Sequence, residues 1–126
     1  MRIAKEDIPV KIDVPGATAR QISDFGDATG YGKIGGEYFT LGAGTDISPL
    51  LQGLDGDLCQ SPHWGYVIEG RIRVNYEDGT EERVGAGEIY YWPSGHTTVV
   101  EEAIRMVEFS PHDQMSEVLA HVVGKL

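Results

Sequence analysis

Apolar and polar residues alternate along several short stretches of the chain, which is the pattern of half-buried β-strands. The first stretch covers residues 8–14 and stops at Pro15-Gly16. The same pattern, with Pro49 interrupting one stretch, predicts the following further strands: 18–25, 37–41, 45–54, 64–69, 71–76, 81–84, 88–92, 97–101 and 103–109. Five glycines between residues 26 and 36 predict a loop or a bulged entrance to a strand. The chain is therefore expected to be mostly β.

Two glycine signals mark how the central strands connect. Gly70 separates two apolar stretches that otherwise form one run, so we expect the chain to bend there. Asp78-Gly79 predicts a tight two-residue hairpin, because both residues tolerate a positive φ. Together they predict a hairpin of long, bent strands in the middle of the chain.

One helix is predicted at the end of the sequence, over residues 111–123. Ser110 is a candidate N-cap, Pro111 suits the first helical position, and Asp113 adds an acidic residue to the first turn. Gly124 is a natural stop. Four apolar residues recur at helical spacing on one face: Met115, Val118, Leu119 and Val122. We expect this helix to pack on the outside of the β structure.

Length and composition support a single domain spanning residues 1–126. With 126 residues, of which 40% are hydrophobic, the chain can close one core. Its 17 glycines and 6 prolines are spread along the sequence, which suits short strands joined by tight turns. The expected fold is an all-β barrel or sandwich followed by a short helix.

The charge of the chain excludes several kinds of partner. Twenty acidic and ten basic residues give a net charge of -10, which repels nucleic-acid phosphates and anionic membrane surfaces. No apolar run approaches the roughly 20 residues that span a bilayer. The charged amino terminus does not resemble a secretory signal, and Cys59 has no second cysteine to pair with. A cytoplasmic location is therefore expected.

Cys59, His63 and His96 are the best candidate metal ligands. Asp57, Cys59 and His63 are even numbers of residues apart, so an extended backbone turns them to one face. His96 shares its face with Thr98 and would lie about 6.6 Å nearer the rim, at roughly 3.3 Å per residue. A thiolate and two imidazoles favour zinc, iron, nickel or copper over magnesium or calcium. Three such ligands leave a fourth position open, as in catalytic zinc sites.

Each of these residues also has a simpler structural interpretation. A lone cysteine in a barrel wall is commonly a small buried apolar residue. His63 follows Pro62 and fits a turn cap, while His96 fits a rim histidine bonded to backbone. A nucleophilic interpretation is also open, with the Cys59 thiol activated by His63 as base. The sequence leaves these alternatives standing.

The region from residue 37 to residue 110 resembles the cupin superfamily, small β-barrels that often hold a metal and bind small molecules. The first cupin motif has a glycine and two histidines separated by one residue. A glutamate follows, and then a second glycine seven residues later. If Gly70 is that second glycine, Asp57 and Cys59 occupy the two histidine positions and His63 the glutamate position.

The second cupin motif, G-x5-P-x-G-x2-H, is also matched in spacing. Gly87, Pro93 and Gly95 fall on it without a gap, Thr98 stands at the histidine position, and His96 comes two residues earlier. All four usual metal positions of the family are thus substituted in this chain.

The resemblance implies a cupin-like antiparallel β-barrel of the jelly-roll type that binds a small molecule. It also implies a range of metal-dependent reactions, namely isomerase, lyase and oxygenase chemistry, which would here use Cys59, His63 and His96. Four further residues are expected to contact the ligand: Asp57, Tyr66, Tyr91 and Thr98. The alternative is a metal-free barrel that binds or senses a ligand without catalysis.

Cupin-like barrels commonly pair, so the resemblance also implies a homodimer. The apolar first strand, from Ile8 to Val14, offers an edge whose backbone groups a second copy of the chain would satisfy.

Overall fold

The computed structural model describes residues 3–25 and 32–126. Seven antiparallel strands form one sheet in the order β1-β2-β3-β7-β4-β5, with β6 paired to β4. The strands are β1 (Val10–Val14), β2 (Ala17–Ile22), β3 (Ile34–Leu41), β4 (His63–Tyr76), β5 (Glu81–Gly85), β6 (Ile89–Trp92) and β7 (His96–Pro111). The helical segments are η1 (Lys5–Asp7), α1 (Ser48–Leu51), η2 (Asp55–Asp57) and α2 (His112–Lys125). Most of the glycine-rich stretch before residue 36 lies outside the described residues, and Gly35 and Gly36 belong to β3.

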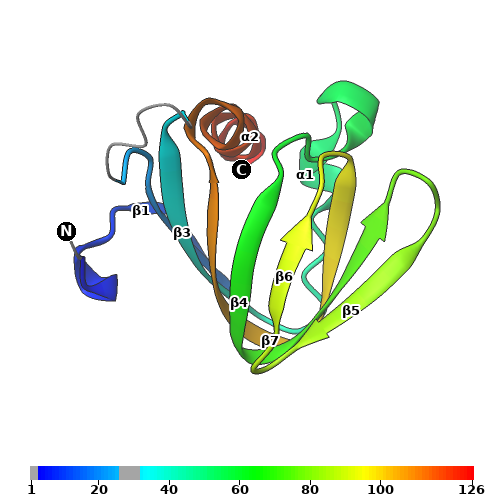
Figure 1. Cartoon of the computed structure of the whole chain (residues 1–126), viewed down its shortest axis with the longest axis horizontal. Coiled ribbons are helices and arrows are strands. Elements are labelled where there is room, and N and C mark those ends of the chain that lie inside the picture. The colour runs from blue at the N-terminus through cyan, green and yellow to red at the C-terminus, as the bar shows by residue number, and fades with distance from the viewer. Residues whose placement is uncertain (1–2, 26–31) are drawn as a thin grey trace.

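The predicted all-β fold with a C-terminal helix is confirmed. Strands β4 and β7 are long and pair over most of their length, so they reach into both arms of the folded sheet (Figure 1). The hydrogen-bonded path is open, because β1 and β5 are its two ends and do not pair with each other within the described chain. The result is a barrel-like jelly roll without a closed ring of hydrogen bonds.

Gly70 bends β4 as the sequence predicts. Its φ is 90°, and a Cβ at this position would lie 2.2 Å from the carbonyl oxygen of Ala103. The pairing of β4 with β7 shifts register on both sides of it, between Val67 and Ile72. Only glycine fits this close approach of two strands at the fold of the sheet.

The hairpin between β4 and β5 is present, but its turn differs from the predicted one. Tyr76 donates its N–H to Thr80 O at 2.9 Å, so three residues form the loop. Only Gly79 has a positive φ. Asp78 instead accepts hydrogen bonds from the amide and hydroxyl of Thr80. A three-residue turn that ends in a left-handed glycine is the next most common hairpin connection.

The strand predicted over residues 45–54 is wrong. This segment contains the short helix α1, in which Pro49 stands in the first turn. A proline there costs no hydrogen bond, because the first amides of a helix have no acceptor within it. Leu51 is thereby buried beneath α2.

The helix α2 does not pack on the outside of the barrel. Its apolar residues Met115, Val118, Leu119 and Val122 are buried against Leu51 and Cys59, with Ile12 and Phe39 packed around them. Figure 1 shows α2 lying across the opening between the arms of the sheet. The open side of an unclosed barrel exposes apolar residues, and the amphipathic helix covers them.

A second apolar cluster fills the interior between β4, β5, β6 and β7. It contains Val67, Ile72, Val74, Val84, Tyr90, Trp92, Val100, Ile104 and Met106. The candidate site lies where this cluster meets the one beneath α2. No helix among the described residues is both long and apolar enough to cross a membrane.

Candidate metal centre

Three separate segments bring Cys59, His63 and His96 together. The segment after η2 is pinned to the start of β7, because Cys59 N–H donates to His96 O at 2.9 Å and Gly95 N–H donates to Cys59 O at 2.8 Å. His63 is the first residue of β4 and pairs with Trp92 of β6. The site is thus built on strand ends that the sheet holds in register.

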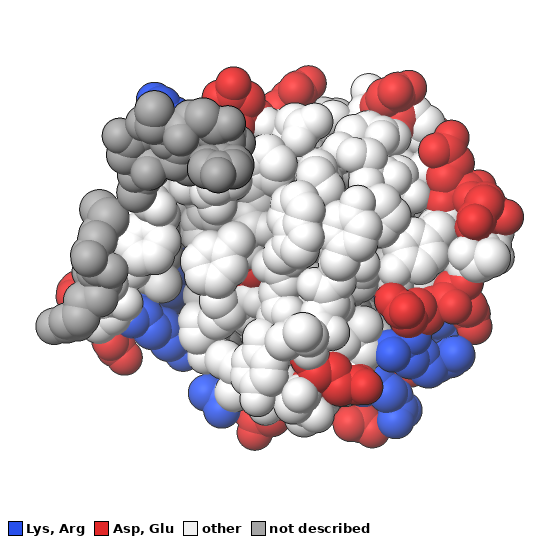
Figure 2. All heavy atoms as spheres, viewed as in Figure 1, with Lys and Arg blue, Asp and Glu red and all other residues white. Residues whose placement is uncertain are grey.

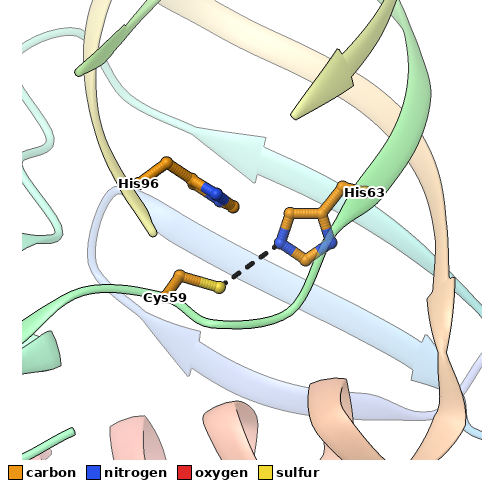
Figure 3. A group of neighbouring side chains, drawn as sticks. All are labelled: Cys59, His63 and His96. Carbon is orange, nitrogen blue, oxygen red and sulfur yellow. Dashed lines mark hydrogen bonds between the residues drawn. The ribbon is translucent and has the colours of Figure 1, made fainter. Parts of the chain in front are cut away.

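The three side chains converge in the interior. The Cys59 Sγ to His63 Nε2 distance is 3.4 Å, and one donor atom from each residue lies within 4.8 Å of the others. Figure 3 shows the Cys59 sulfur and the His63 ring pointing at one another, with the His96 ring beside them. All three residues are buried. In a tetrahedral zinc site, a sulfur and a nitrogen ligand are roughly 3.5 Å apart, so the observed spacing fits a bound metal.

The hydrogen bonds of the two histidines leave the correct nitrogen free for a metal. His96 Nδ1–H donates to Pro93 O at 2.7 Å, so its Nε2 carries the lone pair. The hydroxyl of Ser110 donates to Glu37, so its oxygen accepts from His63 Nδ1–H at 2.6 Å. His63 Nε2 therefore carries a lone pair that faces Cys59. Such second bonds, to a carbonyl or a carboxylate network, orient histidine ligands in metal sites.

Burial keeps the three candidate ligands neutral in the absence of a cation. It raises the pKa of the Cys59 thiol to about 12, and the neighbouring Glu108 and Glu37 push that pKa in the same direction. It also lowers the pKa of His63 well below its ordinary value, with His96 adding to the effect, and lowers the pKa of His96. Neutral imidazoles are ready ligands, and a coordinated cation would deprotonate the thiol.

His96 lies deeper than its place in the sequence suggests. Its backbone bond to Pro93 matches the rim interpretation, but its ring is buried and its centroid is 5.0 Å from that of His63. Gly95, with a φ of 88°, turns the chain immediately before it. The offset of two residues from the cupin histidine position therefore does not remove this imidazole from the site.

The sequence analysis missed Glu37, Glu108 and Ser110. The two glutamates are direct cross-strand partners on β3 and β7, and they are 1% and 2% exposed. Glu108 Oε2 lies 3.1 Å from His63 Nδ1, and the Tyr90 hydroxyl donates to Glu108 Oε1 at 2.7 Å. The alternation of apolar and polar residues could have revealed the two glutamates, because each stands at a position of its strand where the pattern expects an inward-facing apolar residue.

Burial also controls the charge of these two acids. It raises the pKa of Glu37 from 4.5 to about 7, although the hydrogen bond from Ser110 lowers it in part. Burial first, and Glu37 second, raise the pKa of Glu108 well above its ordinary value. Ser110, predicted as a helix N-cap, instead points its hydroxyl into this network, and Pro111 takes the N-cap position without a side-chain bond.

A cavity of about 140 Å³ adjoins the three candidate ligands. Its wall is mostly apolar, and the polar side chains in it include Cys59, His63, His96 and Glu108. The apolar part of the wall comes from both sheet and helices, with Phe39, Leu41, Leu51, Trp92, Met106 and Leu119 among its residues. A small molecule held here would find most of its polar contacts near the candidate metal ligands, with Thr45 as a further polar residue in the wall.

The four residues expected to contact a ligand do not gather around this cavity. Asp57 is exposed, has a φ of 57° and accepts a hydrogen bond from Gly53 N–H at 2.9 Å. That left-handed turn breaks the extended run on which its predicted orientation depended. Tyr66 and Tyr91 are exposed on the outer face, and Thr98 is buried but does not line the cavity. The inward aromatic residues of β6 are Tyr90 and Trp92, and Phe39 of β3 also lines the cavity.

Comparisons with known proteins place the fold. The cupin domain family matches residues 60–101, while no curated protein matches the sequence. Similar solved structures include oxalate decarboxylase from Bacillus subtilis at pH 4.6 and a structure of the same enzyme described for its Mn(II) centres, each with a TM-score of 0.59 and 19% identity. Each comparison covers 86% of this chain but only 28% of the oxalate decarboxylase chain.

These similarities identify the fold but not the chemistry of the site, because a sequence identity of 19% supports an inference about the fold alone. The family match covers the stretch from just after Cys59 to Glu101, which includes β4, β5, β6 and the start of β7. The family match over residues 60–101 and the shared fold together support the predicted resemblance to the cupin superfamily.

Proposed function

We propose that this chain is a small-molecule cupin in which Cys59, His63 and His96 hold a divalent transition metal. The observation that carries the proposal is the convergence of one thiol and two imidazoles in a buried place beside the cavity. Three protein ligands leave room for a water or a substrate atom on the metal. The proposed activity is metal-dependent isomerase, lyase or oxygenase chemistry on a small molecule.

The donor set favours zinc, iron, nickel or copper. Thiolate and imidazole are soft-to-borderline ligands, whereas manganese prefers carboxylates and water. The metal would therefore differ from the Mn(II) of the structurally similar oxalate decarboxylase. Bound there, such an ion would supply Lewis-acid or water-activating chemistry.

The surroundings of the site favour a largely apolar substrate with a single polar head. The cavity wall would bind the apolar part and exclude water, and the head would face His63, His96 and Glu108. A dianion such as oxalate fits poorly, because the cavity wall is mostly apolar and no lysine or arginine of the described residues lines it. Burying a charge that has too few charged or hydrogen-bonding partners is costly.

Metal analysis of protein purified without a histidine tag tests the proposal. We expect a near-stoichiometric zinc, iron, nickel or copper ion in the wild type and its loss in Cys59→Ser. His121→Ala is the matched control, because His121 does not line the cavity and its Nε2 bonds to the Gln52 carbonyl. A wild type that contains no transition metal, and whose melting temperature does not respond to a chelator, overturns the proposal.

The alternative function is a metal-free barrel that binds a small organic ligand. The apolar cavity and the neutral Cys59 thiol, with its pKa of about 12, favour this alternative. The same metal analysis separates the two functions. We also propose a cytoplasmic location, because a free, buried cysteine is compatible with that reducing compartment.

We also propose that the chain forms a homodimer through the outer face of β4, β6 and β7. Five large residues there are between 42% and 84% exposed: Trp64, Tyr66, Ile89, Tyr91 and Phe109. Strand pairing makes them neighbours, and the Trp64 and Tyr91 rings stack with centroids 5.2 Å apart. Figure 2 shows a wide uncharged area over β4 and β6, with charged side chains around its margin.

The size of this face suits a second copy of the chain. At roughly 200 Å² per large side chain, the five residues expose about 500 Å², a large part of the roughly 800 Å² that each partner buries in a stable dimer. The edge strand β1, our expected interface, exposes less, with Val10 and Val14 as its large apolar residues.

Sedimentation tests the dimer and its interface. We expect a dimer at micromolar concentration, a monomer for Ile89→Glu or Tyr91→Glu, and an unchanged dimer for Val10→Glu. A wild type that sediments as a 13.8 kDa monomer overturns the proposal. If Val10→Glu were the only one of the three substitutions to dissociate the dimer, the interface would instead be the β1 edge that the sequence predicts.

A further inference from the structure

Glu37 and Glu108 are placed where a purely structural core would not put them. They face each other across β3 and β7 and are the only buried acidic residues in the described part of the chain. Like charges directly opposite one another destabilise a sheet. An interior that served packing alone would hold apolar residues here, as Phe39 and Met106 do two residues away on the same strands.

In the part of the chain that the structure describes, the two carboxylates also lack a lysine or arginine neighbour. Within residues 3–25 and 32–126, no lysine or arginine forms an ion pair with either one. Ser110 and Tyr90 each donate one hydrogen bond, to Glu37 Oε1 and Glu108 Oε1. Glu37 Oε2 is buried and has no hydrogen-bond partner. An unpartnered carboxylate oxygen in a buried place calls for a proton or a cation.

A nitrogen donor completes a second cluster around these oxygens. Donor atoms of Glu37, His63 and Glu108 all lie within 4.8 Å of one another, and His63 Nδ1 is 3.1 Å from Glu108 Oε2. Two carboxylates and one imidazole suit a hard divalent cation. We propose that Glu37, Glu108 and Nδ1 of His63 form a second metal position that takes a hard cation such as Mn²⁺.

The second position and the proposed Cys59 centre share His63 and therefore compete. This step rests on the proposed function. A metal beside Cys59 needs the lone pair on His63 Nε2 and leaves the proton on Nδ1, where Ser110 accepts it. A cation at the carboxylates needs the lone pair on Nδ1 instead. Because a neutral imidazole has only one such lone pair, the chain holds either a soft ion on the sulfur side or a hard ion on the carboxylate side.

Titration of metal-free protein with Mn²⁺, followed by electron paramagnetic resonance and by melting temperature, tests the second position. We expect one bound Mn²⁺ in the wild type and an affinity at least about tenfold lower in Glu37→Gln and Glu108→Gln. Cys59→Ser should bind Mn²⁺ like the wild type, because it alters only the sulfur side. Glu117→Gln is the matched control, since Glu117 is exposed on α2.

Competition then tests the exclusion and separates the two proposals. One equivalent of Zn²⁺ should release Mn²⁺ from the wild type but not from Cys59→Ser. A wild type that binds no Mn²⁺, or Gln variants that bind it undiminished, overturns the second position and leaves the Cys59 centre untouched. Simultaneous binding of Zn²⁺ and Mn²⁺ overturns the exclusion. Zinc that binds Cys59→Ser as tightly as the wild type overturns the Cys59 centre instead.

Discussion

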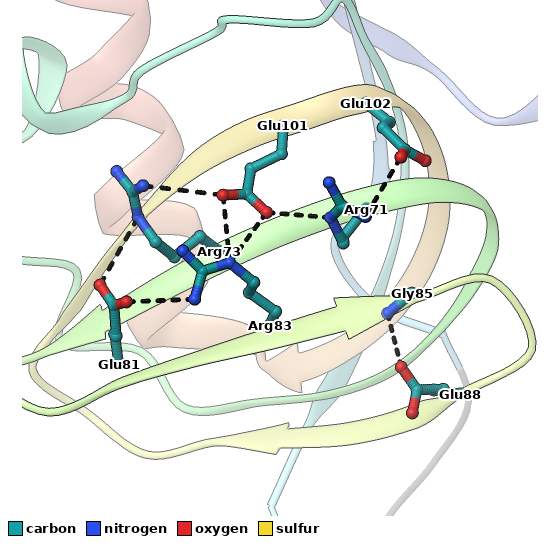
Figure 4. Close-up of polar contacts among 8 residues, drawn as sticks. All are labelled: Arg71, Arg73, Glu81, Arg83, Gly85, Glu88, Glu101 and Glu102. Carbon is teal, nitrogen blue, oxygen red and sulfur yellow. Dashed lines mark hydrogen bonds and ion pairs between the residues drawn. The ribbon is translucent and has the colours of Figure 1, made fainter.

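Acidic residues occur in two contrasting settings on the same sheet. On the surface of β4, β5 and β7, Glu101 is surrounded by arginines, with Arg71 Nε at 3.0 Å and Arg83 Nε at 3.1 Å (Figure 4). In the interior, Glu37 and Glu108 face each other with hydroxyl and imidazole groups but, among the described residues, no arginine. The surface acids are compensated by the protein itself, whereas the interior acids are left for something else to compensate.

The pKa values follow the same division. Partial burial would raise the pKa of Glu101, but hydrogen bonds from Arg71 and Arg83 hold it below its ordinary value. Glu37 and Glu108 move the opposite way, because burial dominates. A surface network of this kind contributes to solubility and little to stability. An uncompensated interior pair costs stability, so its presence indicates a function.

The largest effect is expected from His63→Ala. This change removes a ligand that both proposed metal positions use, so most of the metal should be lost. It also leaves Ser110 and Glu108 without a buried partner, which should lower the free energy of unfolding by about 3 kcal/mol or more. Metal analysis and denaturant melts with and without chelator measure the two parts separately.

His96→Ala sharpens that test. Because His96 is buried beside His63, its loss should remove as much metal from the Cys59 centre as His63→Ala does. It should leave Mn²⁺ binding at the two glutamates intact. Full retention of the transition metal in His96→Ala would contradict the inward placement of this imidazole.

The next effect is the pH dependence of the metal-free protein. A folded-state pKa of about 7 for Glu37, against an ordinary 4.5, means that the folded state binds the proton more tightly. The contribution of Glu37 to the free energy of unfolding should therefore be most favourable at or below about pH 4.5. It should fall by about 3 kcal/mol as the pH rises to about 7. Glu37→Gln should flatten that slope, as measured by chemical denaturation at each pH.

The control for this profile is Glu117→Gln, which should follow the wild type at every pH. Parallel profiles for the wild type and Glu37→Gln would show that the buried pair titrates normally, and would remove the contrast with the surface acids.

The fold could be predicted because its signals are local. Gly70 indicates a close approach of two strands, and the alternation of apolar and polar residues indicates which face of a strand is buried. The placement of α2 could not be predicted, since an amphipathic helix looks the same whether it covers the outside or the open side of a barrel. The turn at Asp57 rotates that side chain into solvent, and it follows Asp55-Gly56, a turn signal that the argument from even spacing did not take into account.

The candidate site was only half predictable for a similar reason. Cys59, His63 and His96 stand out by residue type, so chemistry identified them before their positions were known. Ser110 was assigned to the helix because serine commonly caps helices, but the long-range contact with Glu37, 73 residues away, determines its role. Long-range pairing of this kind depends on strand register, which turns and bulges alter.

A smaller effect is expected from Tyr90→Phe. Its hydroxyl donates to Glu108 at 2.7 Å inside the core, and its loss removes one hydrogen bond from a buried acid. The free energy of unfolding should fall by about 1–2 kcal/mol. Tyr91→Phe is the matched control, since it keeps the ring that stacks on Trp64 and removes only a hydroxyl outside the core, and it should change little. Equal effects of the two substitutions would mean that Glu108 does not depend on this bond.

The smallest effect is expected in the surface network, from Arg83→Ala. The Arg83 guanidinium contacts both Glu101 and Glu81, yet all three side chains are at least partly exposed. Solvent and salt screen such pairs, so the free energy of unfolding should fall by less than it does in Tyr90→Phe. The loss should shrink further as sodium chloride is raised. The contrary outcome is a loss as large as that of Tyr90→Phe that does not change with salt. It would show that the surface acids depend on their arginines as strongly as Glu37 and Glu108 depend on their own neighbours. The contrast between the two regions would then fail.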